Sequence, residues 1–125
     1  MVHVKGLVSV VCPFRNEIKC LKEFLDSFIN QTYKKIEIIL IDNDSSDGSE
    51  KIAMEYAKKY KFIKIYHIPH IPGTWATYLY IEAIKKATGE LFYMADANVK
   101  VDPDYFEKSL IHFEDPNVAG VVGYV

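Results

Sequence analysis

Side chains that carry oxygen ligands follow three separate apolar runs of this 125-residue sequence. Pro13–Glu17 follows the first run, Asp42–Asp44 follows the second, and Asp96–Asn98 follows the third. Carboxylate and amide oxygens are the ligands of hard cations such as Mg²⁺ and Mn²⁺, which proteins commonly hold with one or two carboxylates plus the phosphates of a substrate. The three segments together favour a site for a metal ion or a nucleotide.

Asp96 and Asn98 are the pair most specific to that chemistry. They stand two residues apart, so in an extended segment their side chains point to the same side. Asp96 also follows its apolar run directly, with no helix pattern starting at once behind it. Asp42–Asp44 has an equally good structural explanation, because Asp, Asn, Ser and Gly after a strand are ordinary turn and helix-cap residues. The residues alone leave both interpretations of that segment open.

The hydrophobic periodicity predicts strands that alternate with helices. Leu21, Phe24, Leu25 and Phe28 recur at the spacing of an amphipathic helix. The run Ile36–Ile41 is almost entirely apolar, as expected for a strand covered on both faces. We predict strands at 7–12, 36–41, 62–67, 90–95 and 118–125, with helices over about 21–28, 50–60, 74–88 and 102–113.

Several residues mark the expected helix ends. Asp47 and Glu50 have the spacing of a capping pair at the start of the second helix. Gly89 is placed to end the third helix in a left-handed conformation. Asp102 followed by Pro103 is the pattern of an N-cap with proline in the first turn.

The order of these elements predicts an α/β fold. Strands separated by helices of about 10–15 residues indicate βαβ units, and therefore a mostly parallel sheet, of about five strands, with helices on both faces. Ligands of such sheets bind outside the carboxyl ends of the strands, where the strand order reverses. If the second and fourth strands flank the first, the three oxygen-bearing segments meet in one crevice. No repeat or linker divides the chain, so we expect residues 1–125 to form a single domain.

Composition argues against several classes of protein. The formal net charge is −2 and the basic residues are scattered, so no nucleic-acid partner is expected. The apolar stretches are shorter than the roughly 18 residues of a membrane span, and no signal-peptide pattern follows Met1. Cys12 and Cys20 match no zinc spacing, which indicates free thiols and a cytoplasmic location. His67 and His70 flank Pro69, and we interpret them as part of a solvated loop.

Three motifs, in this order, resemble the amino-terminal half of a family 2 glycosyltransferase. They are VSVVCPFRNE at 8–17, IILIDNDSSDGS at 38–49 and ATGELFYMADAN at 87–98, the last followed by Asp102-Pro103. The resemblance implies a Rossmann-like GT-A fold with three α/β/α layers. It also implies a nucleotide sugar as donor, linked to UDP or GDP, with a single-step, inverting transfer to an acceptor that the sequence does not identify.

The same resemblance assigns residue roles. Asp96–Asn98 stands where the family places its DxD motif, which binds a divalent cation bridging the donor's diphosphate. Asp96 and Asn98 would then ligate Mn²⁺ or Mg²⁺, which stabilises the departing diphosphate as a Lewis acid. The residues expected to contact the nucleotide sugar are Pro13, Phe14, Arg15, Glu17, Asp42, Asp44, Asp96 and Ala97.

The sequence departs from the family pattern at two points, one within the third motif and one before it. Asn98 offers a carbonyl oxygen but no charge. The missing charge weakens cation binding by about a few kcal/mol, which is the interaction energy of two unit charges in contact at an effective dielectric near 20. Tyr80, Ile81 and Ala83 occupy the positions of an Arg-Asn pair and a nearby glycine, and they suit a packed helix face. Arg15, the only arginine, could contact a phosphate instead.

The resemblance further implies that residues 1–125 lack the acceptor half and the carboxylate that serves as catalytic base. The apolar run at 118–125 leads us to expect a homodimer that covers it. A module that binds a nucleotide sugar or a partner without catalysis stays open as the alternative function. A nucleotidyltransferase is disfavoured, because no glycine-rich, basic phosphate loop follows the first strand.

Overall fold

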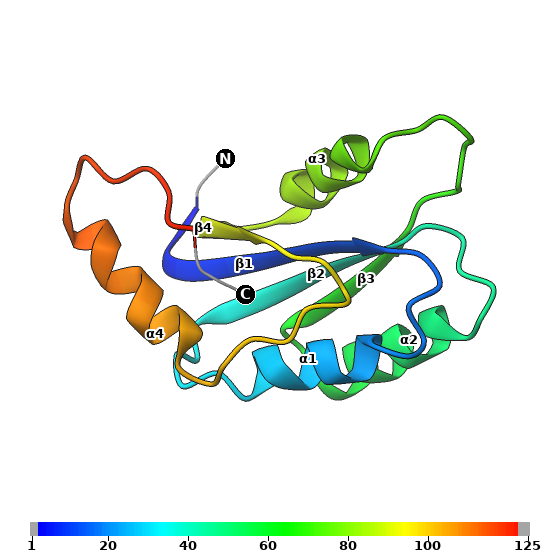
Figure 1. Ribbon diagram of the computed structural model, residues 1–125, viewed down its shortest axis with the longest axis horizontal. Helices are drawn as coiled ribbons and strands as arrows, with labels where there is room; N and C mark the ends of the chain where they lie inside the picture. Colours follow the sequence, from blue (N-terminus) through cyan, green and yellow to red (C-terminus); the bar gives the residue numbers. More distant parts are fainter. Residues whose placement is uncertain (1–2, 123–125) are drawn as a thin grey trace.

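A computed structural model describes residues 3–122 and contains a four-stranded sheet with helices on both faces (Figure 1). The strands are all parallel and lie in the order β3-β2-β1-β4. The predicted α/β class is confirmed. The elements are β1 (Val4–Phe14), α1 (Leu21–Ile29), β2 (Ile36–Asp42), α2 (Ser49–Lys59), β3 (Ile63–His67), α3 (Ala76–Lys86), β4 (Gly89–Met94), α4 (Tyr105–Leu110) and a 3₁₀ turn (Ile111–Glu114).

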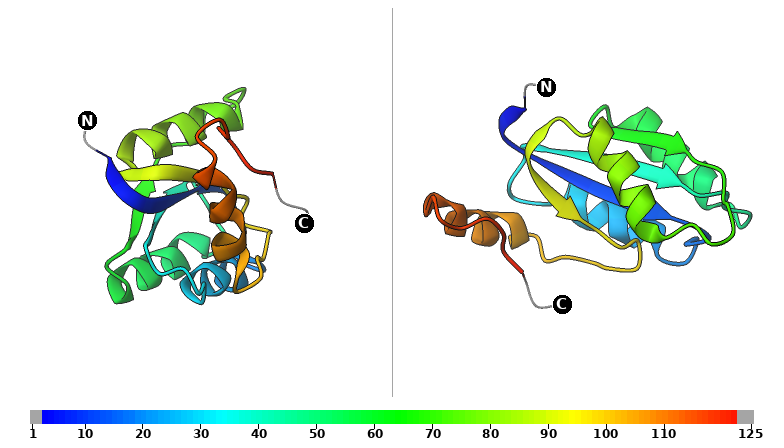
Figure 2. Two further views of the ribbon diagram at one scale, coloured as in Figure 1. Left: turned by 90° about the vertical axis from the view of Figure 1, so that its left-hand side faces the viewer. Right: turned by 90° about the horizontal axis from the view of Figure 1, so that it is seen from above.

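The sheet separates two apolar layers, and Figure 2 shows the helices on either side of the sheet in two further views. Alternate strand residues such as Val10 and Leu40 pack against α1, α2 and α4 on one face. Their neighbours Val11 and Ile39 pack against α3 on the other. Every residue of β2 is buried, as its continuous apolar sequence predicts for a central parallel strand.

Helix α1 follows the predicted pattern, whereas α2 begins differently from the prediction. The buried side chains of α1 include Leu21, Phe24, Leu25 and Phe28. The N-cap of α2 is Gly48, with φ 98° and no side chain of its own, so the predicted N-cap Asp47 lies one residue before it. The Asp47 carboxylate instead accepts hydrogen bonds from the amide and hydroxyl of Ser49, which draws it away from the predicted pairing with Glu50.

A buried carboxylate joins three strands at the end of the sheet opposite the three oxygen-bearing segments. Glu37 in β2 accepts hydrogen bonds from the Ser9 hydroxyl (2.7 Å) and the Thr88 amide (2.6 Å). The Ser9 hydroxyl in turn accepts the Gly89 amide at 2.8 Å. Gly89 therefore opens β4 and is not a left-handed helix cap: a Cβ there would lie 2.4 Å from Ser9 Oγ and 2.6 Å from the carbonyl oxygen of Leu7.

The region after β4 differs most from the prediction. Helix α4 starts at Tyr105, with Asp104 as its N-cap, because residues 102–104 form a turn in which the Asp102 carbonyl accepts the Tyr105 amide. Asp115 then takes an extended conformation before Pro116, which ends the 3₁₀ turn.

No strand forms at residues 118–122, the described part of the predicted fifth strand; residues 123–125 lie outside the described residues. The Val118 amide bonds back to the Asp115 carbonyl, and Gly120 carries no side chain to pack, so both disfavour a strand.

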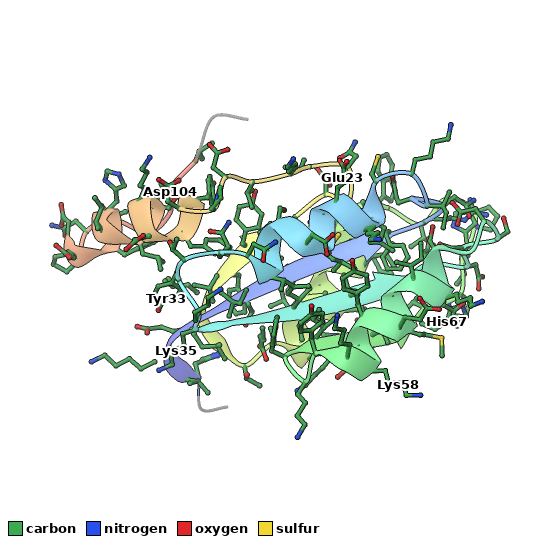
Figure 3. All side chains as sticks on the ribbon, turned by 90° about the horizontal axis from the view of Figure 1, so that it is seen from below. Glu23, Tyr33, Lys35, Lys58, His67 and Asp104 are labelled. Carbon is green, nitrogen blue, oxygen red and sulfur yellow. The ribbon has the colours of Figure 1, made fainter. Side chains whose placement is uncertain are left out.

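The surface carries charges of both signs, spread over all the elements. Lys35, Lys58, Glu23 and Asp104 lie far apart around the molecule (Figure 3). Within residues 3–122, no helix has the length and apolar character needed to cross a membrane.

Candidate functional site

The carboxyl ends of the strands bring the three oxygen-bearing segments to one edge of the sheet. The Asn43 amide donates to the Phe14 carbonyl at 2.9 Å, which joins the end of β2 to the end of β1. The Ala95 amide donates to the Val11 carbonyl, also at 2.9 Å, which joins the segment after β4 to β1. Because β2 and β4 flank β1, the strand order reverses beside β1, the place where open α/β sheets bind ligands.

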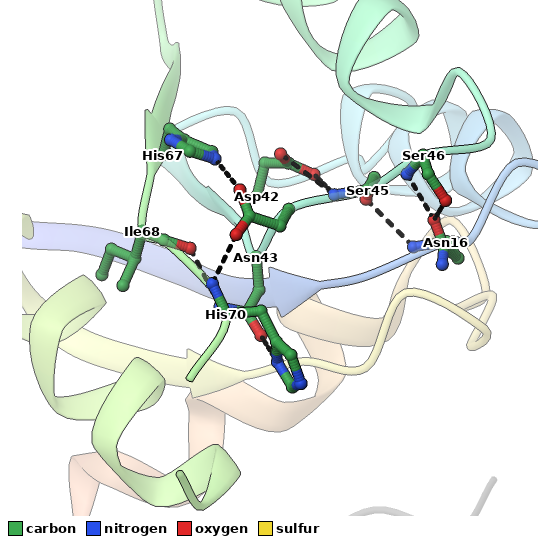
Figure 4. A network of polar contacts seen from close by, with 9 residues as sticks. Asn16, Asp42, Asn43, Ser45, Ser46, His67, Ile68 and His70 are labelled. Carbon is green, nitrogen blue, oxygen red and sulfur yellow. Dashed lines mark hydrogen bonds and ion pairs between the residues drawn. The ribbon is translucent and has the colours of Figure 1, made fainter. Parts of the chain in front are cut away.

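Hydrogen bonds that involve side chains connect the segment after β1 to the segment after β2 (Figure 4). The Asn16 amide donates to Ser45 Oγ at 3.0 Å, and the Asn16 side-chain oxygen accepts the Ser46 amide at 2.7 Å. The Glu17 amide donates to Ser49 Oγ at 2.8 Å. Asn16 adopts φ 55°, a left-handed conformation that asparagine tolerates better than most residues. These bonds fix the backbone after Arg15, and the Phe14 carbonyl that accepts the Asn43 amide fixes it before. Arg15 itself is exposed.

Asp42 is a fully buried carboxylate at this edge. The hydrogen bonds it accepts within residues 3–122 come from a single donor, the Ser45 amide, at 3.3 and 3.4 Å from its two oxygens. An ionised carboxylate can accept about four hydrogen bonds, and a buried one is stable only when its oxygens are satisfied. Asp42 therefore has unused acceptor capacity, although its side chain has no surface open to solvent in this structure.

Both carboxylate oxygens of Asp44 already bond to other residues of the chain. Its Oδ1 lies 2.5 Å from His67 Nε2, and its Oδ2 accepts the His70 amide at 2.6 Å. The His70 amide, followed by the His67 ring, lowers the pKa of the Asp44 carboxyl, and the hydrogen bond to Asp44 raises the pKa of His67. Asn43 completes the cluster by donating its side-chain NH₂ to the Ile68 carbonyl and meeting His70 Nδ1 at 3.1 Å. Asp44 thus ties the end of β3 to the end of β2.

Asp96 is exposed and bonded to a residue of α3. The Tyr80 hydroxyl lies 2.9 Å from Asp96 Oδ1 and 2.7 Å from the Ala95 carbonyl. Burial, reinforced by the hydrogen bond to Asp96, raises the pKa of the Tyr80 hydroxyl, so it stays protonated and donates. Asp96 Oδ2 accepts no hydrogen bond from a described residue.

The donors near Asp96 suit a cation that completes its shell from a substrate. Asn98 is exposed two residues away and offers an amide oxygen. No group of three or more His, Cys, Asp or Glu side chains within residues 3–122 is arranged to hold a metal by itself. One carboxylate oxygen and one amide oxygen therefore fit a Mg²⁺ or Mn²⁺ ion only when phosphates and water supply the remaining ligands.

The other predicted contact residues would act mainly through their backbone. Phe14 is buried in the core beside α1, and Ala97 is buried behind the turn that carries Asp96 and Asn98. Pro13 is half-buried in β1, and Glu17 holds its place through the amide that bonds Ser49.

Sequence reasoning missed three residues at this edge. His67 and His70 were expected in solvent, and both are indeed exposed, but both bond to Asp44. Tyr80 was expected on a packed helix face; its ring does contact the core, and its hydroxyl reaches Asp96. Two features of the sequence could have indicated these contacts. His67 ends a predicted strand, which places it at the same edge as Asp44, and Tyr80 lies in the segment where the resembling family has its Arg-Asn pair.

Comparison with known proteins places this geometry in a family. The model of the family described as glycosyl transferase family 2 matches residues 9–125. A curated relative in Methanococcus voltae, "Dolichyl N-acetyl-alpha-D-glucosaminyl phosphate 3-beta-D-2,3-diacetamido-2,3-dideoxy-beta-D-glucuronosyltransferase", is 31% identical over 129 aligned residues, covering 96% of this chain and 39% of its own length.

Two solved structures share the fold. The mannosyltransferase PcManGT from Pyrobaculum calidifontis, in complex with GDP-Man and Mn²⁺, superposes with a TM-score of 0.77 at 24% identity, over 89% of this chain and 33% of that chain. S. aureus TarS 1–349 in complex with UDP-GlcNAc superposes with a TM-score of 0.76 at 21% identity, over 93% of this chain and 37% of that chain. The chain spans less than half the length of each of these proteins.

Proposed function

The chain belongs to glycosyl transferase family 2, and on this premise we propose that residues 1–125 form a domain that binds a nucleotide sugar and acts in the transfer of its sugar to an acceptor. Asp42 carries the proposal. It is fully buried, beside the reversal of strand order, and within residues 3–122 it accepts only two long hydrogen bonds. A ligand that displaces what covers Asp42 and donates an N–H or O–H to it would offset the cost of burying this charge.

The nucleoside would lie along the connected segments after β1 and β2. Asp42 would accept a hydrogen bond from the base or the ribose. Pro13 and Phe14 would form the floor of the site through the end of β1, and Glu17 would hold its far wall in place. Arg15 lies beside this floor with an exposed guanidinium, whose planar fork matches a phosphate.

The diphosphate would lie toward Asp96, Ala97 and Asn98. Asp96 and Asn98 would hold Mn²⁺ or Mg²⁺ together with two or more phosphate oxygens. Bound there, the cation would supply Lewis-acid stabilisation to the charge that develops on the departing nucleoside diphosphate. Ala97, buried between them, would keep the turn in place.

The ligands of the two solved relatives support this class of donor. PcManGT is in complex with GDP-Man and Mn²⁺, and TarS with UDP-GlcNAc. We therefore propose a UDP- or GDP-linked sugar as donor and Mn²⁺ or Mg²⁺ as cofactor.

We propose that transfer is a single displacement with inversion. The acceptor oxygen bonds to the anomeric carbon while the bond from that carbon to the diphosphate oxygen breaks, and a carboxylate base takes the acceptor's proton. The acidic residues around α4 do not suit this role: Asp104 pairs with Lys108 at 2.8 Å, and Glu107 accepts the Thr32 hydroxyl. We assign the base to none of the described residues.

A binding module without catalysis is the second candidate. The neutral side chain of Asn98 favours it, because a second carboxylate is missing from the cation site. Incubation with a donor labelled in its sugar separates the two functions. Release of nucleoside diphosphate, or transfer of label to an acceptor, supports the enzyme, whereas nucleotide binding without any release supports the module.

Thermal denaturation tests the proposal as a whole. A ligand that binds only the folded state stabilises it by mass action, so a UDP- or GDP-sugar with Mn²⁺ should raise Tm. A panel of UDP- and GDP-linked sugars at several concentrations shows which nucleobase the donor carries. No shift with any member of the panel contradicts the proposal.

Two further points belong to the proposal. Cys12 and Cys20 are free cysteines, which supports a cytoplasmic location. A second copy of this chain is the proposed protein partner, although residues 118–122, part of the run on which that expectation rested, form no strand. A monodisperse monomer in light scattering would contradict the proposal.

A further inference from the structure

We propose that Tyr80 is a positioning residue for the cation: its hydroxyl holds the Asp96 carboxylate by Oδ1 and leaves Oδ2 as the oxygen offered to the metal. The inference rests on the proposed function, because it assigns the cation and the diphosphate to Asp96.

Tyr80 reaches Asp96 from a different element of the fold. It lies in α3, which covers the face of the sheet formed by Val11, Ile39 and Ile41, and its ring packs against that cluster. The hydroxyl has one proton, which it shares between the Ala95 carbonyl at 2.7 Å and Asp96 Oδ1 at 2.9 Å. A ring held by packing fixes the position of the hydroxyl oxygen, from which the proton reaches either acceptor.

The backbone around Asp96 is fixed by other contacts. The Ala95 amide bonds the Val11 carbonyl, and the Val99 amide bonds the Asp96 carbonyl at 3.1 Å, which closes a turn over Asp96, Ala97 and Asn98. Ala97 is buried, which anchors the middle of that turn. The backbone therefore has anchors that do not involve Tyr80.

Gln31, which follows α1, anchors the far end of the same segment. Gln31 is fully buried; its amide donates to the Asp102 carbonyl at 2.6 Å, and its oxygen accepts the Phe106 amide at 3.1 Å. The segment is thus held at both ends. What the Tyr80 hydroxyl adds is the orientation of one side chain, that of Asp96.

That orientation matters more here because Asn98 is neutral. Asp96 is the one carboxylate of the pair, so the cation depends on a single charged oxygen ligand from it. Partners that orient a metal-ligating carboxylate contribute about 10–100-fold to metal affinity in characterised sites. Loss of the Tyr80 hydroxyl should therefore weaken Mn²⁺ binding about tenfold, with the nucleoside end of the site unchanged.

The variant Tyr80→Phe keeps the ring and removes the hydroxyl. Its matched control is Tyr78→Phe, which removes the hydroxyl of an exposed tyrosine on the same helix. Calorimetry gives the affinity for UDP and for GDP with and without Mn²⁺, and the electron paramagnetic resonance signal of free Mn²⁺ gives the fraction of metal bound. Circular dichroism reports whether each variant is folded.

The expected result is a split between the two affinities. Tyr80→Phe should leave nucleotide affinity without metal unchanged and reduce the gain from Mn²⁺ about tenfold, while Tyr78→Phe changes neither. Equal losses with and without Mn²⁺, or an unchanged gain from Mn²⁺, would overturn the role of Tyr80 and leave the proposed function standing. Wild-type protein that binds neither nucleotide, with or without Mn²⁺, would overturn the proposed function and this inference together.

Discussion

Nε2 of His67 lies 2.5 Å from Oδ1 of Asp44, a contact that joins the ends of β3 and β2 beside the candidate nucleotide site. Both side chains are nearly half exposed, so water and salt screen the pair. The contact also orients Asp44, whose other oxygen accepts the His70 amide. The contact therefore stabilises the backbone that enters the segment before α3.

The stability contributed by this pair should depend on pH. The pKa of His67 is raised, so its contribution is complete below its ordinary value of 6.5 and is lost as pH rises through the higher folded value. The pKa of Asp44 is lowered, so its contribution is complete above 3.8 and is lost as pH falls through the lower folded value. The difference in Tm between wild type and His67→Gln should be largest between about pH 4 and 6.5 and shrink at alkaline pH.

The matched control for that measurement is His112→Gln, an exposed histidine in the 3₁₀ turn. Its Tm should follow wild type across the whole range. A His67→Gln effect that is constant from pH 5 to 9 would mean that the histidine stabilises the loop without its charge.

Gly89 should not tolerate a side chain. In Gly89→Ala the new Cβ would lie 2.4 Å from Ser9 Oγ and 2.6 Å from the Leu7 carbonyl, which belongs to the backbone and cannot swing away. Overpacking of this kind costs about 1–3 kcal/mol. Urea denaturation should detect that loss, whereas Gly120→Ala, where nothing lies within 4 Å, should be near neutral. Equal stability of the two variants would refute this account of the β1–β4 junction.

Parallel strand geometry explains which part of the site could be predicted. The carboxyl ends of neighbouring parallel strands share one edge, so the sequence positions of Asp42 and Asp96 place both residues at that edge on the condition that β2 and β4 flank β1, and the strand order meets this condition. The continuous apolar run of β2 and the spacing of Leu21, Phe24 and Phe28 in α1 likewise carry their structure locally.

Contacts between loops could not be predicted in this way. The partners of Asp44 are residues more than twenty positions later, and no periodicity encodes that contact. The run 118–122 has strand-like composition, yet forms no strand because the Val118 amide bonds Asp115. Tyr80 has the spacing of a buried helix residue, so its packing could be predicted. The contact of its hydroxyl with Asp96 could not, because the spacing does not indicate where the hydroxyl lies.

Adding a charge at position 98 should strengthen the cation site. Asn98→Asp supplies a second carboxylate near Asp96, and an added charge at contact distance is worth on the order of a few kcal/mol at an effective dielectric near 20. We expect Mn²⁺ affinity in the presence of UDP or GDP to rise at least about tenfold, as measured by calorimetry. Asn117→Asp, which adds the same charge after the 3₁₀ turn, should leave it unchanged. A rise in both variants would point to net charge and not to a site.

Arg15 should act through its shape as well as its charge. Arg15→Lys keeps the charge but loses the planar fork that binds a phosphate with two parallel hydrogen bonds. Nucleotide affinity should fall several-fold in this variant, while Lys58→Ala at the end of α2 should have no effect. Unchanged affinity in Arg15→Lys would contradict the proposal that this residue binds the diphosphate.

We propose that the buried carboxylate of Asp42 binds the nucleoside, and Asp42→Asn is the substitution that tests this role. The substitution keeps the shape and removes the charge, and a lost hydrogen bond to a charged group costs about 1.5–3 kcal/mol, or roughly 10–150-fold in affinity. The measurement is the calorimetric Kd for UDP and GDP without metal, with Glu55→Gln on α2 as control for the loss of an exposed negative charge. We expect a loss of at least about tenfold for Asp42→Asn in a folded protein and none for Glu55→Gln. Wild-type affinity in Asp42→Asn would contradict the proposed role.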